Sequence, residues 1–539
     1  MKDRQRGVYA TNYVAIRMYP AVMNRNIRTS FTDPIQIATL SARSGRIGVS
    51  FCPGKQSRSI GGFDWRRDLG VDLDAVSEWG AAAVISLIED HEISTLGVSN
   101  LGSEVAARRM EWIHLPIPDV TAPGEEFEQG WLSAGARVRG LLTSGQSVFI
   151  HCKGGLGRAG TVAARLLIEL GEADSKSAIA RVREVRRGAV ETVSQEAHLH
   201  SIWKLFDRAR GCLLGLAVGD ALGTTLEFRS RDSYDHITDM IGGGPFGLDA
   251  GTWTDDTSMA LALGEALLAS AAKGSIFEPA EAQKRFVEWW RNGSYSPTGD
   301  CFDIGITTRQ ALSRFEQTGD PISGSADPFS AGNGSLMRLA PVAIWGTRAD
   351  PSVMTRVARR QSMTTHAAEA CLEACDAYSL ILRAAILGAD FYGALTHARG
   401  DYGPEIGPII AGSWRGKQRD QISSSGFVAH SLEAALWCLD NTDNFDEAVL
   451  LAANLGDDAD TTAAITGQLA GALYGSSSIR PSWLEKLAWR EEIVSVRARG
   501  VISGVGDGVF RGGACPTPEC GVAGGHRVHR YGGVCTLQP

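Results

Sequence analysis

The pattern of apolar and polar residues divides the chain into a mixed first part and a helical second part. Between residues 31 and 203, short apolar runs alternate with amphipathic stretches, which is typical of strands that alternate with helices. Buried strands are predicted at residues 82–87, 112–117 and 147–150, and a helix is predicted at residues 161–170. Because alternating strands and helices form a mainly parallel sheet, this part is predicted to be an α/β domain.

From residue 204 to residue 497, strand signals are sparse and apolar residues recur at helical spacing. Three clear examples, all rich in Ala and Leu, are residues 369–387, 431–439 and 463–474. This part is therefore predicted to be an all-α bundle with functional loops at the helix ends. Residues 194–210, between the two parts, are expected to form one or two helices without a flexible spacer. The two domains should therefore pack closely.

Neither end of the chain shows a periodic pattern. Residues 1–30 are expected to be a loose leader, and the glycine-rich residues 498–539 are expected to be a disordered tail. The tail contains five potential zinc ligands, namely Cys515, Cys520, His526, His529 and Cys535. Their spacing fits no common zinc finger, so zinc binding and a structureless tail are the two alternatives, and the second is favoured.

Length and charge restrict the class of protein. With 539 residues the chain is too long for one ordinary core, so at least two domains are expected. Lys and Arg total 53 against 61 Asp and Glu, a formal charge of −8, which argues against a nucleic-acid platform. The sequence shows no signal peptide and no run of about 18 apolar residues, so no membrane span is predicted. The 10 cysteines are mostly scattered, which favours reduced thiols in the cytoplasm.

A glycine-rich loop, HCKGGLGR at residues 151–158, directly follows the third predicted strand and leads into a helix. Its amides and the helix N-terminus are expected to form a cradle for an anion. The same field favours the thiolate form of Cys152, the candidate nucleophile, and Arg158 can bind two phosphoryl oxygens. The predicted phosphate-binding residues are Lys153, Gly154, Gly155, Leu156, Gly157 and Arg158. The alternative is an ordinary glycine turn beside a buried cysteine.

With this loop, residues 31–203 resemble the cysteine-dependent tyrosine and dual-specificity phosphatases, and most closely the cyclin-dependent-kinase-inhibitor-associated type. The resemblance implies a general acid on an upstream loop, and Asp119 in the segment Pro118-Asp119-Val120 fits this role. Asp119 could instead be only a turn residue after proline. The segment with Glu191, Thr192 and Gln195 resembles a later loop in which a glutamine positions water.

One residue departs from the phosphatase pattern. A Ser or Thr that assists hydrolysis of the phospho-cysteine often follows the arginine, but here the position is Ala159. Thr161 lies two residues further along the chain. This departure concerns the rate of turnover rather than the binding of phosphate.

Two acidic clusters, far apart in the sequence, each precede an apolar helical pattern. The first lies in GTWTDDTSMALALGEALL at residues 251–268 and the second in LGDDADTTAAI at residues 455–465. The candidate metal ligands in them are Thr254, Asp255, Asp256, Asp458, Asp460 and Thr461. A helix cap needs only one or two such oxygens, and adjacent carboxylates repel unless a cation lies between them. Together the clusters would suit Mg²⁺ or Mn²⁺, whereas separately each could be a cap.

Six segments in the second part resemble the ADP-ribosylglycohydrolase family, which includes the dinitrogenase-reductase-activating glycohydrolases. In chain order they are GCLLGLAVGDALGTTLEF (211–228), GGGPFGLDAGTWTDDT (242–257), FDIGITTRQAL (302–312), AGNGSLMRLAPVA (331–343), TTHAAEA (364–370) and LGDDADTTAAI (455–465). The resemblance implies hydrolysis of the N- or O-glycosidic bond that joins ADP-ribose to a protein side chain. It also implies that the acidic clusters hold two Mg²⁺ ions.

The same resemblance implies roles for residues outside the acidic clusters. Glu227 would steer water or a ribose hydroxyl, although it could be a surface glutamate. The diphosphate would be held by Asn333, Gly334 and Ser335. His366 is either a ribose contact or a structural histidine. Asp457 replaces a glycine that is common in the family, so it either disturbs the metal geometry or faces solvent.

The sequence thus predicts a bifunctional hydrolase. One domain would cleave ADP-ribose from a protein or small molecule, and the other would remove phosphate from a phosphotyrosine, phosphoserine or small phospho-substrate. The alternative is an ADP-ribose-binding module in which the phosphatase half carries the only catalytic activity. No membrane contact is expected, and a nucleic-acid partner is not expected either.

Overall fold

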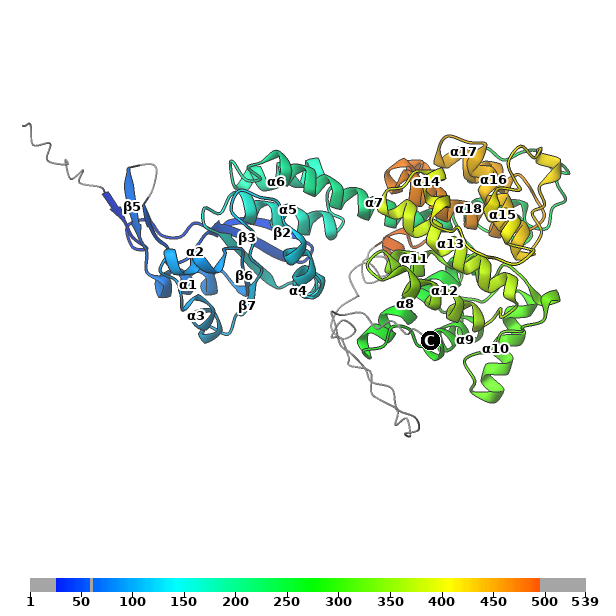
Figure 1. The fold of residues 1–539 in the computed structure, drawn as a ribbon, viewed down its shortest axis with the longest axis horizontal. Coiled ribbons are helices and arrows are strands. Elements are labelled where there is room, and N and C mark those ends of the chain that lie inside the picture. The colour runs from blue at the N-terminus through cyan, green and yellow to red at the C-terminus, as the bar shows by residue number, and fades with distance from the viewer. Residues whose placement is uncertain (1–25, 59–61, 495–539) are drawn as a thin grey trace, which may run out of the picture.

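The computed structural model of the chain describes residues 26–58 and 62–494, which form two domains joined by one long helix (Figure 1). The expected disordered tail with its potential zinc ligands lies outside these residues, and so do the first 25 residues of the expected leader.

The first domain is built on a five-stranded sheet of order β2-β3-β8-β6-β7. Its strands are β2 (Ala38–Ala42), β3 (Gly45–Phe51), β6 (Ala81–Ser86), β7 (Glu111–His114) and β8 (Ser147–Cys152). Strand β2 is antiparallel to β3, whereas β3, β8, β6 and β7 pair in parallel. The predicted mainly parallel sheet is therefore confirmed, and the three predicted strands correspond to β6, β7 and β8.

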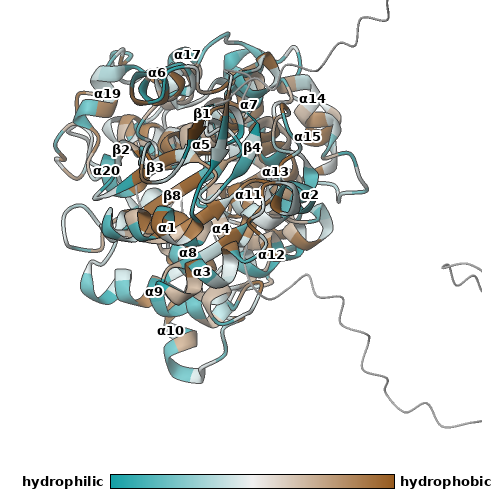
Figure 2. Ribbon diagram, turned by 90° about the vertical axis from the view of Figure 1, so that its left-hand side faces the viewer, coloured by the Kyte–Doolittle hydropathy of each residue, from teal (hydrophilic) through white to brown (hydrophobic). Residues whose placement is uncertain are grey.

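Helices cover this sheet and bury its apolar side chains. They are α1 (Leu69–Glu78), α2 (Asp90–Thr95), α3 (Leu101–Ala107), α4 (Glu125–Thr143), α5 (Gly157–Glu169) and α6 (Ser175–Val185). Figure 2 shows that strands β3 and β8 are largely hydrophobic and lie inside the domain. Helix α5 begins four residues before the predicted start at residue 161, because the glycine-rich loop turns into the helix already at Gly157.

A second, three-stranded sheet of order β1-β5-β4 projects from the end of the first domain that lies away from the second domain (Figure 1). Its strands are β1 (Asn26–Arg28), β4 (Gln56–Arg58) and β5 (Phe63–Arg66). Strand β1 pairs in parallel with β5, so the end of the expected leader is part of a sheet.

Helix α7 (Val193–Gly223) is 31 residues long and belongs to both domains. It starts against α5 and α6 of the first domain and continues into the centre of the second (Figure 1). The Thr192 side chain accepts a hydrogen bond from the amide of Gln195 and so caps its first turn. The junction is thus a single continuous helix.

The second domain is helical, as predicted, and its described residues form no strand, only isolated bridges. Its helices are α8 (Asp255–Ala272), α9 (Pro279–Asn292), α10 (Ile306–Thr318), α11 (Ala340–Gly346), α12 (Pro351–Met363), α13 (Glu369–Leu387), α14 (Phe391–Thr396), α15 (Gly407–Ala411), α16 (Val428–Asp440), α17 (Phe445–Ala453), α18 (Ala459–Tyr474), α19 (Pro481–Lys486) and α20 (Arg490–Glu492). Four 3₁₀ turns are η1 (Thr224–Leu226), η2 (Pro328–Ser330), η3 (Arg419–Gln421) and η4 (Ser476–Ser478). Within residues 26–58 and 62–494, no helix combines the length and apolar character needed to cross a bilayer.

Helices α7 and α18 pack at backbone contact through small residues spaced four apart. On α7 these are Gly211, Gly215, Gly219 and Gly223, and on α18 they are Ala459, Ala463, Gly467 and Gly471. A Cβ atom on Gly215 would lie 2.1 Å from the carbonyl oxygen of Gly467, so no larger side chain fits there. This close packing places the acidic end of α18 beside the last turns of α7.

Candidate active sites

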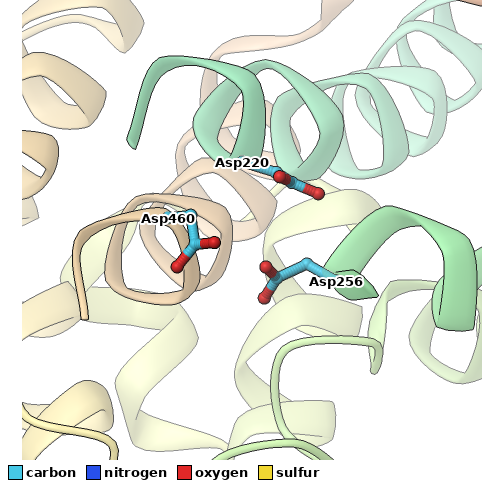
Figure 3. Close-up of side chains that lie close together, drawn as sticks. All are labelled: Asp220, Asp256 and Asp460. Carbon is cyan, nitrogen blue, oxygen red and sulfur yellow. The ribbon is translucent and has the colours of Figure 1, made fainter. Parts of the chain in front are cut away.

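Three carboxylates from three helices converge in the second domain (Figure 3). Asp220 comes from α7, Asp256 from the first turn of α8 and Asp460 from the first turn of α18. One oxygen of each lies within 4.8 Å of the others. The structure therefore brings the two predicted acidic clusters together at one site.

Asp220 was not among the residues expected from the sequence, yet it holds the start of α8 in place. Its two oxygens accept hydrogen bonds from the amide and hydroxyl of Thr254 at 2.8 and 2.9 Å. They also accept from the amide and hydroxyl of Thr257 at 3.0 and 2.6 Å. Asp220 is the only charged residue in residues 211–223, the otherwise apolar last part of α7, and such an isolated buried acid is the signal that marks it.

Thr254 lies between the carboxylates. Its hydroxyl is 3.2 Å from an oxygen of Asp256 and 3.2 Å from an oxygen of Asp460. The second oxygen of Asp256, Oδ1, is buried and has no hydrogen-bond partner among the described residues. An unsatisfied buried carboxylate oxygen is costly unless a cation binds it.

A second group of carboxylates shares Asp460 with the first. One oxygen each of Glu227, Asp458 and Asp460 lie within 4.8 Å of one another. Glu227 is 3% exposed, so it is not a surface residue. Its Oε2 accepts hydrogen bonds from the amides of Ala459 at 2.8 Å and Asp460 at 3.2 Å. Glu227 thus holds the N-terminus of α18 while it faces the other two acids.

Burial and mutual repulsion raise the pKa of every acid in this site. The pKa is raised to about 7 for Asp220, Asp458 and Asp460, mainly by burial. Burial and then the charge of Asp460 raise the pKa of Glu227 well above its usual range. The acids would therefore hold protons without a positive partner.

Asp303, which the sequence argument also missed, belongs to the same acidic region. Burial raises its pKa to about 6, and its side chain interacts with Asp460. Asp303 has a φ of +59°, in the left-handed region, where a side chain with a short polar group is tolerated. Its segment, FDIGITTRQAL, was among those that resembled the family, but nothing in its local pattern singles out an acid.

These residues fit divalent cations. The donor set consists of carboxylates and threonine hydroxyls, which are hard oxygen ligands of the kind that Mg²⁺ and Mn²⁺ prefer. The partnerless Oδ1 of Asp256 and the crowded carboxylates both require positive charge. A pair of simple helix caps would explain neither feature.

The remaining predicted ligands, Asp255 and Thr461, do not belong to either of these close carboxylate groups. Asp255 is 8% exposed, and burial followed by the charge of Asp303 raises its pKa. Thr461 is buried, and its amide donates to Asp460 Oδ1 at 2.7 Å. Asp457 is exposed and has a φ of +59°, in the left-handed region that favours glycine. Of the two alternatives for Asp457, the structure therefore supports the one in which it faces solvent.

The predicted ADP-ribose contacts are arranged beside the second carboxylate group. The Asn333 amide donates to Asp458 Oδ2 at 2.7 Å and to the Ser431 hydroxyl at 2.9 Å. The ring of His366 lies against Gly334, because a Cβ there would be 2.7 Å from its Cε1 atom. Burial, followed by the charge of Arg338, lowers the pKa of His366 to about 3, so the ring is neutral.

Ser335 does not present its side chain to a ligand. The residue is 0% exposed, and its hydroxyl accepts a hydrogen bond from Ser362 at 2.8 Å. Any contact between Ser335 and a diphosphate would therefore have to involve its backbone.

In the first domain, the predicted cradle connects the end of β8 to the start of α5. Cys152 is buried, and the amide of Gly155 donates to its sulfur at 3.2 Å. Gly155 has a φ of +71°, and a Cβ there would lie 2.4 Å from the carbonyl oxygen of Ser50. Only glycine fits this position, which lets the loop curl around the sulfur. Lys153 and Gly154 are exposed, whereas Gly157 is buried.

Arg158 is held at the cradle by two acids. Its guanidinium donates to both oxygens of Glu92, at 2.5 and 3.1 Å, and its Nη2 lies 2.9 Å from Asp119 Oδ1. Glu92 is another residue that the sequence argument missed. Burial raises the pKa of Glu92, but the hydrogen bond from Arg158, the backbone bond at Glu89 and the charge of Arg158 together lower it below its usual range. Asp119 is 51% exposed and so remains open to a substrate.

The segment of residues 191–195 contacts both the phosphate-binding loop and the loop that carries Asp119. Glu191 Oε2 accepts a hydrogen bond from the amide of Gly157 at 2.7 Å. Gln195 accepts from the amide of Glu191 at 2.9 Å and donates to the carbonyl of Thr121 at 2.9 Å. Because Thr121 is two residues from Asp119, Gln195 connects the start of α7 to the loop of the candidate acid.

Ala159 and Thr161 are both buried on α5. The Thr161 hydroxyl donates to the carbonyl of Gly157 at 2.8 Å within the helix. It is therefore occupied by the backbone and does not replace the hydroxyl that is missing at Ala159.

Comparisons with known proteins agree with this division into two domains. The ADP-ribosylglycohydrolase family matches residues 203–507, and the family described as "Polymorphic toxin system, DSP-PTPase phosphatase" matches residues 66–172. The second domain is similar to ADP-ribosylarginine hydrolase Tri1 of Pseudomonas putida (strain GB-1), with 49% identity over 53% of this chain and 76% of that protein.

Two further relatives cover one domain each. The ADP-ribosyl-[dinitrogen reductase] glycohydrolase of Rhodospirillum rubrum is 33% identical over 53% of this chain and 92% of its own length. Cyclin-dependent kinase inhibitor 3 of Rattus norvegicus is 31% identical over 31% of this chain and 78% of its own length. The chain is thus a hydrolase with a phosphatase domain at its N-terminal side.

Proposed function

Because the chain belongs to the ADP-ribosylglycohydrolase family, we propose that its second domain removes ADP-ribose from arginine side chains of proteins with the help of divalent cations. The Pseudomonas putida relative is an ADP-ribosylarginine hydrolase, which supports arginine as the modified residue. The single observation that carries the cation requirement is the convergence of carboxylates from α7, α8 and α18 on one buried site.

In this reaction water replaces the arginine nitrogen on the anomeric carbon of the ribose. The carbon–nitrogen bond breaks, the carbon gains a hydroxyl group, and the released guanidine nitrogen takes a proton. Thr254, Asp256, Asp458 and Asp460 would hold the two Mg²⁺ ions, whose charge would polarise the ribose hydroxyls and acidify the attacking water.

The residues around the ligands orient them and the substrate. Asp220 fixes Thr254, and Asn333 fixes Asp458, so both ligand groups have a defined direction. Glu227 would accept a hydrogen bond from a ribose hydroxyl or the attacking water, and its closeness to Asp458 and Asp460 supports this role. The neutral ring of His366 next to Gly334 offers a flat contact for the ribose.

The test uses the full chain and arginine-linked ADP-ribose, with serine-linked and nucleic-acid-linked ADP-ribose for comparison. We expect release of ADP-ribose to stop in EDTA and to return with excess Mg²⁺. Asp256→Asn and Asp460→Asn each remove one charge at nearly constant shape and should reduce cleavage sharply. Continued cleavage in EDTA, or full activity in both variants, would show that the clusters are only helix caps. Binding without product release would identify an ADP-ribose-binding module instead.

A second activity is favoured by the cradle in the first domain. We propose that Cys152 attacks the phosphorus of a phosphate monoester while Asp119 donates a proton to the leaving oxygen, after which water hydrolyses the phospho-cysteine. The support is the position of the sulfur below the loop amide, with Arg158 contacting Asp119. Because Cys152 has to remain a free thiol, a reducing cytoplasmic environment suits this activity.

This phosphatase activity should be independent of metal and lost in Cys152→Ser. With para-nitrophenyl phosphate, rapid-quench kinetics should show a burst, because Ala159 offers no hydroxyl to assist the second step. Activity that persists in Cys152→Ser would exclude the assignment. Asp256→Asn serves as the control that should keep full phosphatase activity.

A further inference from the structure

Two positively charged side chains, Lys55 and Arg186, donate hydrogen bonds to carbonyl oxygens of the phosphate-binding loop. The Lys55 ammonium donates to the carbonyl of Lys153 at 3.3 Å. The Arg186 guanidinium donates to the carbonyls of Gly155 at 3.0 Å and Gly154 at 3.2 Å. Three consecutive carbonyls of the loop are therefore bound by positive side chains.

This arrangement decides where the loop amides point. In a trans peptide the carbonyl oxygen and the following N–H point in opposite directions. When the carbonyl of Gly154 is held by Arg186, the amide of Gly155 must face the interior of the cradle. The structure shows this amide bonded to the sulfur of Cys152 at 3.2 Å. The same rule directs the amide of Gly154 inward, because Lys55 holds the carbonyl before it.

The two cations come from different elements and are fixed independently. Lys55 lies in the loop after β3, is 8% exposed, and its ammonium is 4.5 Å from the ring centroid of Phe51 and 5.0 Å from that of Trp65. Phe51 is paired with Cys152 in the sheet, so this loop begins directly beside the nucleophile. Arg186 is half-buried at the C-terminus of α6.

Neither cation is neutralised by an acid. Among the described residues, no carboxylate lies within ion-pair distance of Lys55 or Arg186, and their polar contacts are loop carbonyls. Burial lowers the pKa of Lys55 to about 8, against the effect first of Cys52 and then of Cys152, and burial also lowers the pKa of Arg186, against the effect of Cys152. Their charge is therefore directed at the cradle, where a phosphate group would supply the missing negative partner.

We infer that Lys55 and Arg186 are positioning residues of the phosphatase site, which turn the loop amides inward and add positive charge behind Cys152. This inference rests on the proposed phosphatase function for its chemical meaning. It assigns the two cations to phosphate binding and to the reactivity of the thiolate, rather than to the stability of the domain alone.

The test compares Lys55→Met and Arg186→Met with two matched controls in the full chain. Lys176→Met and Arg187→Met remove the same charges from exposed positions on or after α6. The first readout is the Kd of orthovanadate, measured by calorimetry. The second is the rate at which iodoacetamide alkylates Cys152 at a fixed pH, with Cys152→Ser as the blank for the other thiols. Each test variant should weaken vanadate binding about tenfold and slow alkylation several-fold, because a neighbouring cation favours the thiolate by such factors.

Conservative variants separate positioning from mere packing. Arg186→Lys keeps the charge but cannot hold two carbonyls with a fork, so it should recover alkylation more than vanadate binding. A purely structural role would lower the Tm and leave both readouts at the values of the controls. If Lys55→Met and Arg186→Met lower the Tm but leave vanadate binding and alkylation at the control values, the inference is overturned. If one of these two variants fails to fold, the result from the other variant decides.

Hydrolysis of para-nitrophenyl phosphate by the wild-type chain tests the proposed phosphatase function independently of the two variants. If the wild-type chain hydrolyses no para-nitrophenyl phosphate but the variants still change vanadate binding and alkylation, the phosphatase activity is wrong and the positioning role stands. If the wild-type chain is active and the variants match their controls, the activity stands and the positioning role is wrong.

Discussion

At the scale of single residues, Asp220 accepts four hydrogen bonds from Thr254 and Thr257 and lies with Asp256 and Asp460 in one buried group. An aspartate in the apolar last part of α7 would be expensive to bury without such partners. The hydrogen bonds of Asp220 hold the first turn of α8, so that the hydroxyl of Thr254 lies 3.2 Å from an oxygen of Asp460 on α18.

We predict that Asp220→Asn weakens the metal site even though the shape of the side chain is kept. The amide has one acceptor instead of two, so one of the threonines loses its partner, and one negative charge is lost. Mg²⁺ affinity or ADP-ribose release should fall roughly 10- to 100-fold, as for other residues that orient metal ligands. Calorimetric titration with Mg²⁺ and a product assay measure the two effects.

Asp457→Asn is the matched control for this experiment, because the residue is exposed and neighbours the ligand Asp458. It should leave Mg²⁺ affinity and product release unchanged. Equal losses in the two variants would mean that only the net charge of the region matters.

Ala159 gives a second prediction at this scale. Introducing a hydroxyl with Ala159→Ser should accelerate hydrolysis of the phospho-cysteine, because the hydroxyl of Thr161 is occupied by the carbonyl of Gly157. The steady-state rate on para-nitrophenyl phosphate should rise relative to the burst rate. A variant with an unchanged ratio would show that the missing hydroxyl does not limit turnover.

At the scale of elements, the contact between α7 and α18 fixes the distance between Asp220 and Asp460. Four residues of each helix approach so closely that a Cβ on Gly211 would lie 2.2 Å from the carbonyl oxygen of Gly471. The same is true at Gly219, where it would lie 2.1 Å from that of Ala463. Since the atoms in the way are backbone, the helices have no freedom to adapt locally.

We predict that Gly215→Ala destabilises the protein and impairs the metal site. The new methyl group would overlap the carbonyl oxygen of Gly467, so the helices must separate, at a cost of about 1–3 kcal/mol. Gly140→Ala on α4 is the control, because nothing lies within 4 Å of the added methyl group. That variant should stabilise its domain by about 0.5–1 kcal/mol through helix propensity. Chemical unfolding and the Mg²⁺-dependent rise in Tm distinguish the two.

The long apolar elements could be predicted from the sequence because their signal is local. Helix α13 has the predicted limits, and strands β6 and β8 follow the predicted apolar runs. Strand β3 was missed because glycines and a serine interrupt its apolar residues, and β4 because it is short and polar. Strands β3 and β4 are each held in place by the neighbouring strands of their sheet rather than by a pattern in their own sequence.

The same difference applies to the sites. Clusters of adjacent acids and the Cys-to-Arg loop are visible in the sequence, because their members are close along the chain. Asp220, Glu92 and Lys55 are single residues that reach the sites only through helix packing or a crossing loop. Asp303 needs its left-handed backbone and the approach of Asp460 before it becomes part of the acidic group. No local pattern contains that information.

At the scale of the whole molecule, helix α7 connects the two sites. Gln195 in its first turn contacts the carbonyl of Thr121 in the phosphatase domain, and Asp220 near its end belongs to the buried carboxylate group of the second domain. With a rise of 1.5 Å per residue, these positions are about 37 Å apart along the helix. A small molecule cannot contact both sites at once, whereas a protein that carries both modifications could reach each of them.

A buried group of charges lies where the first domain meets the second. Glu169 at the end of α5 is bound by the guanidinium groups of Arg139 and Arg165 and accepts from the Trp131 indole at 3.0 Å. The charge of Arg348, from the loop after α11 in the second domain, also acts on Glu169. Burial by itself raises the pKa of Glu169, but Arg139 and then Arg165 outweigh it and lower the pKa to about 2.

We predict that Glu169→Gln removes a part of the stability that depends on pH. Because the pKa of Glu169 is lower in the folded state than in the unfolded state, its contribution is complete above the ordinary glutamate pKa and is lost as the pH falls towards 2. At pH 7 the variant should be less stable by about 3 kcal/mol, since two buried arginines lose their partner. The difference in stability between wild type and variant should shrink steadily between about pH 4.5 and pH 2.

Urea unfolding followed by tryptophan fluorescence measures this difference, with the exposed Glu184→Gln as the control that should match the wild type at every pH. A difference that stays constant down to pH 2 would mean that Glu169 acts through packing and not through its charge.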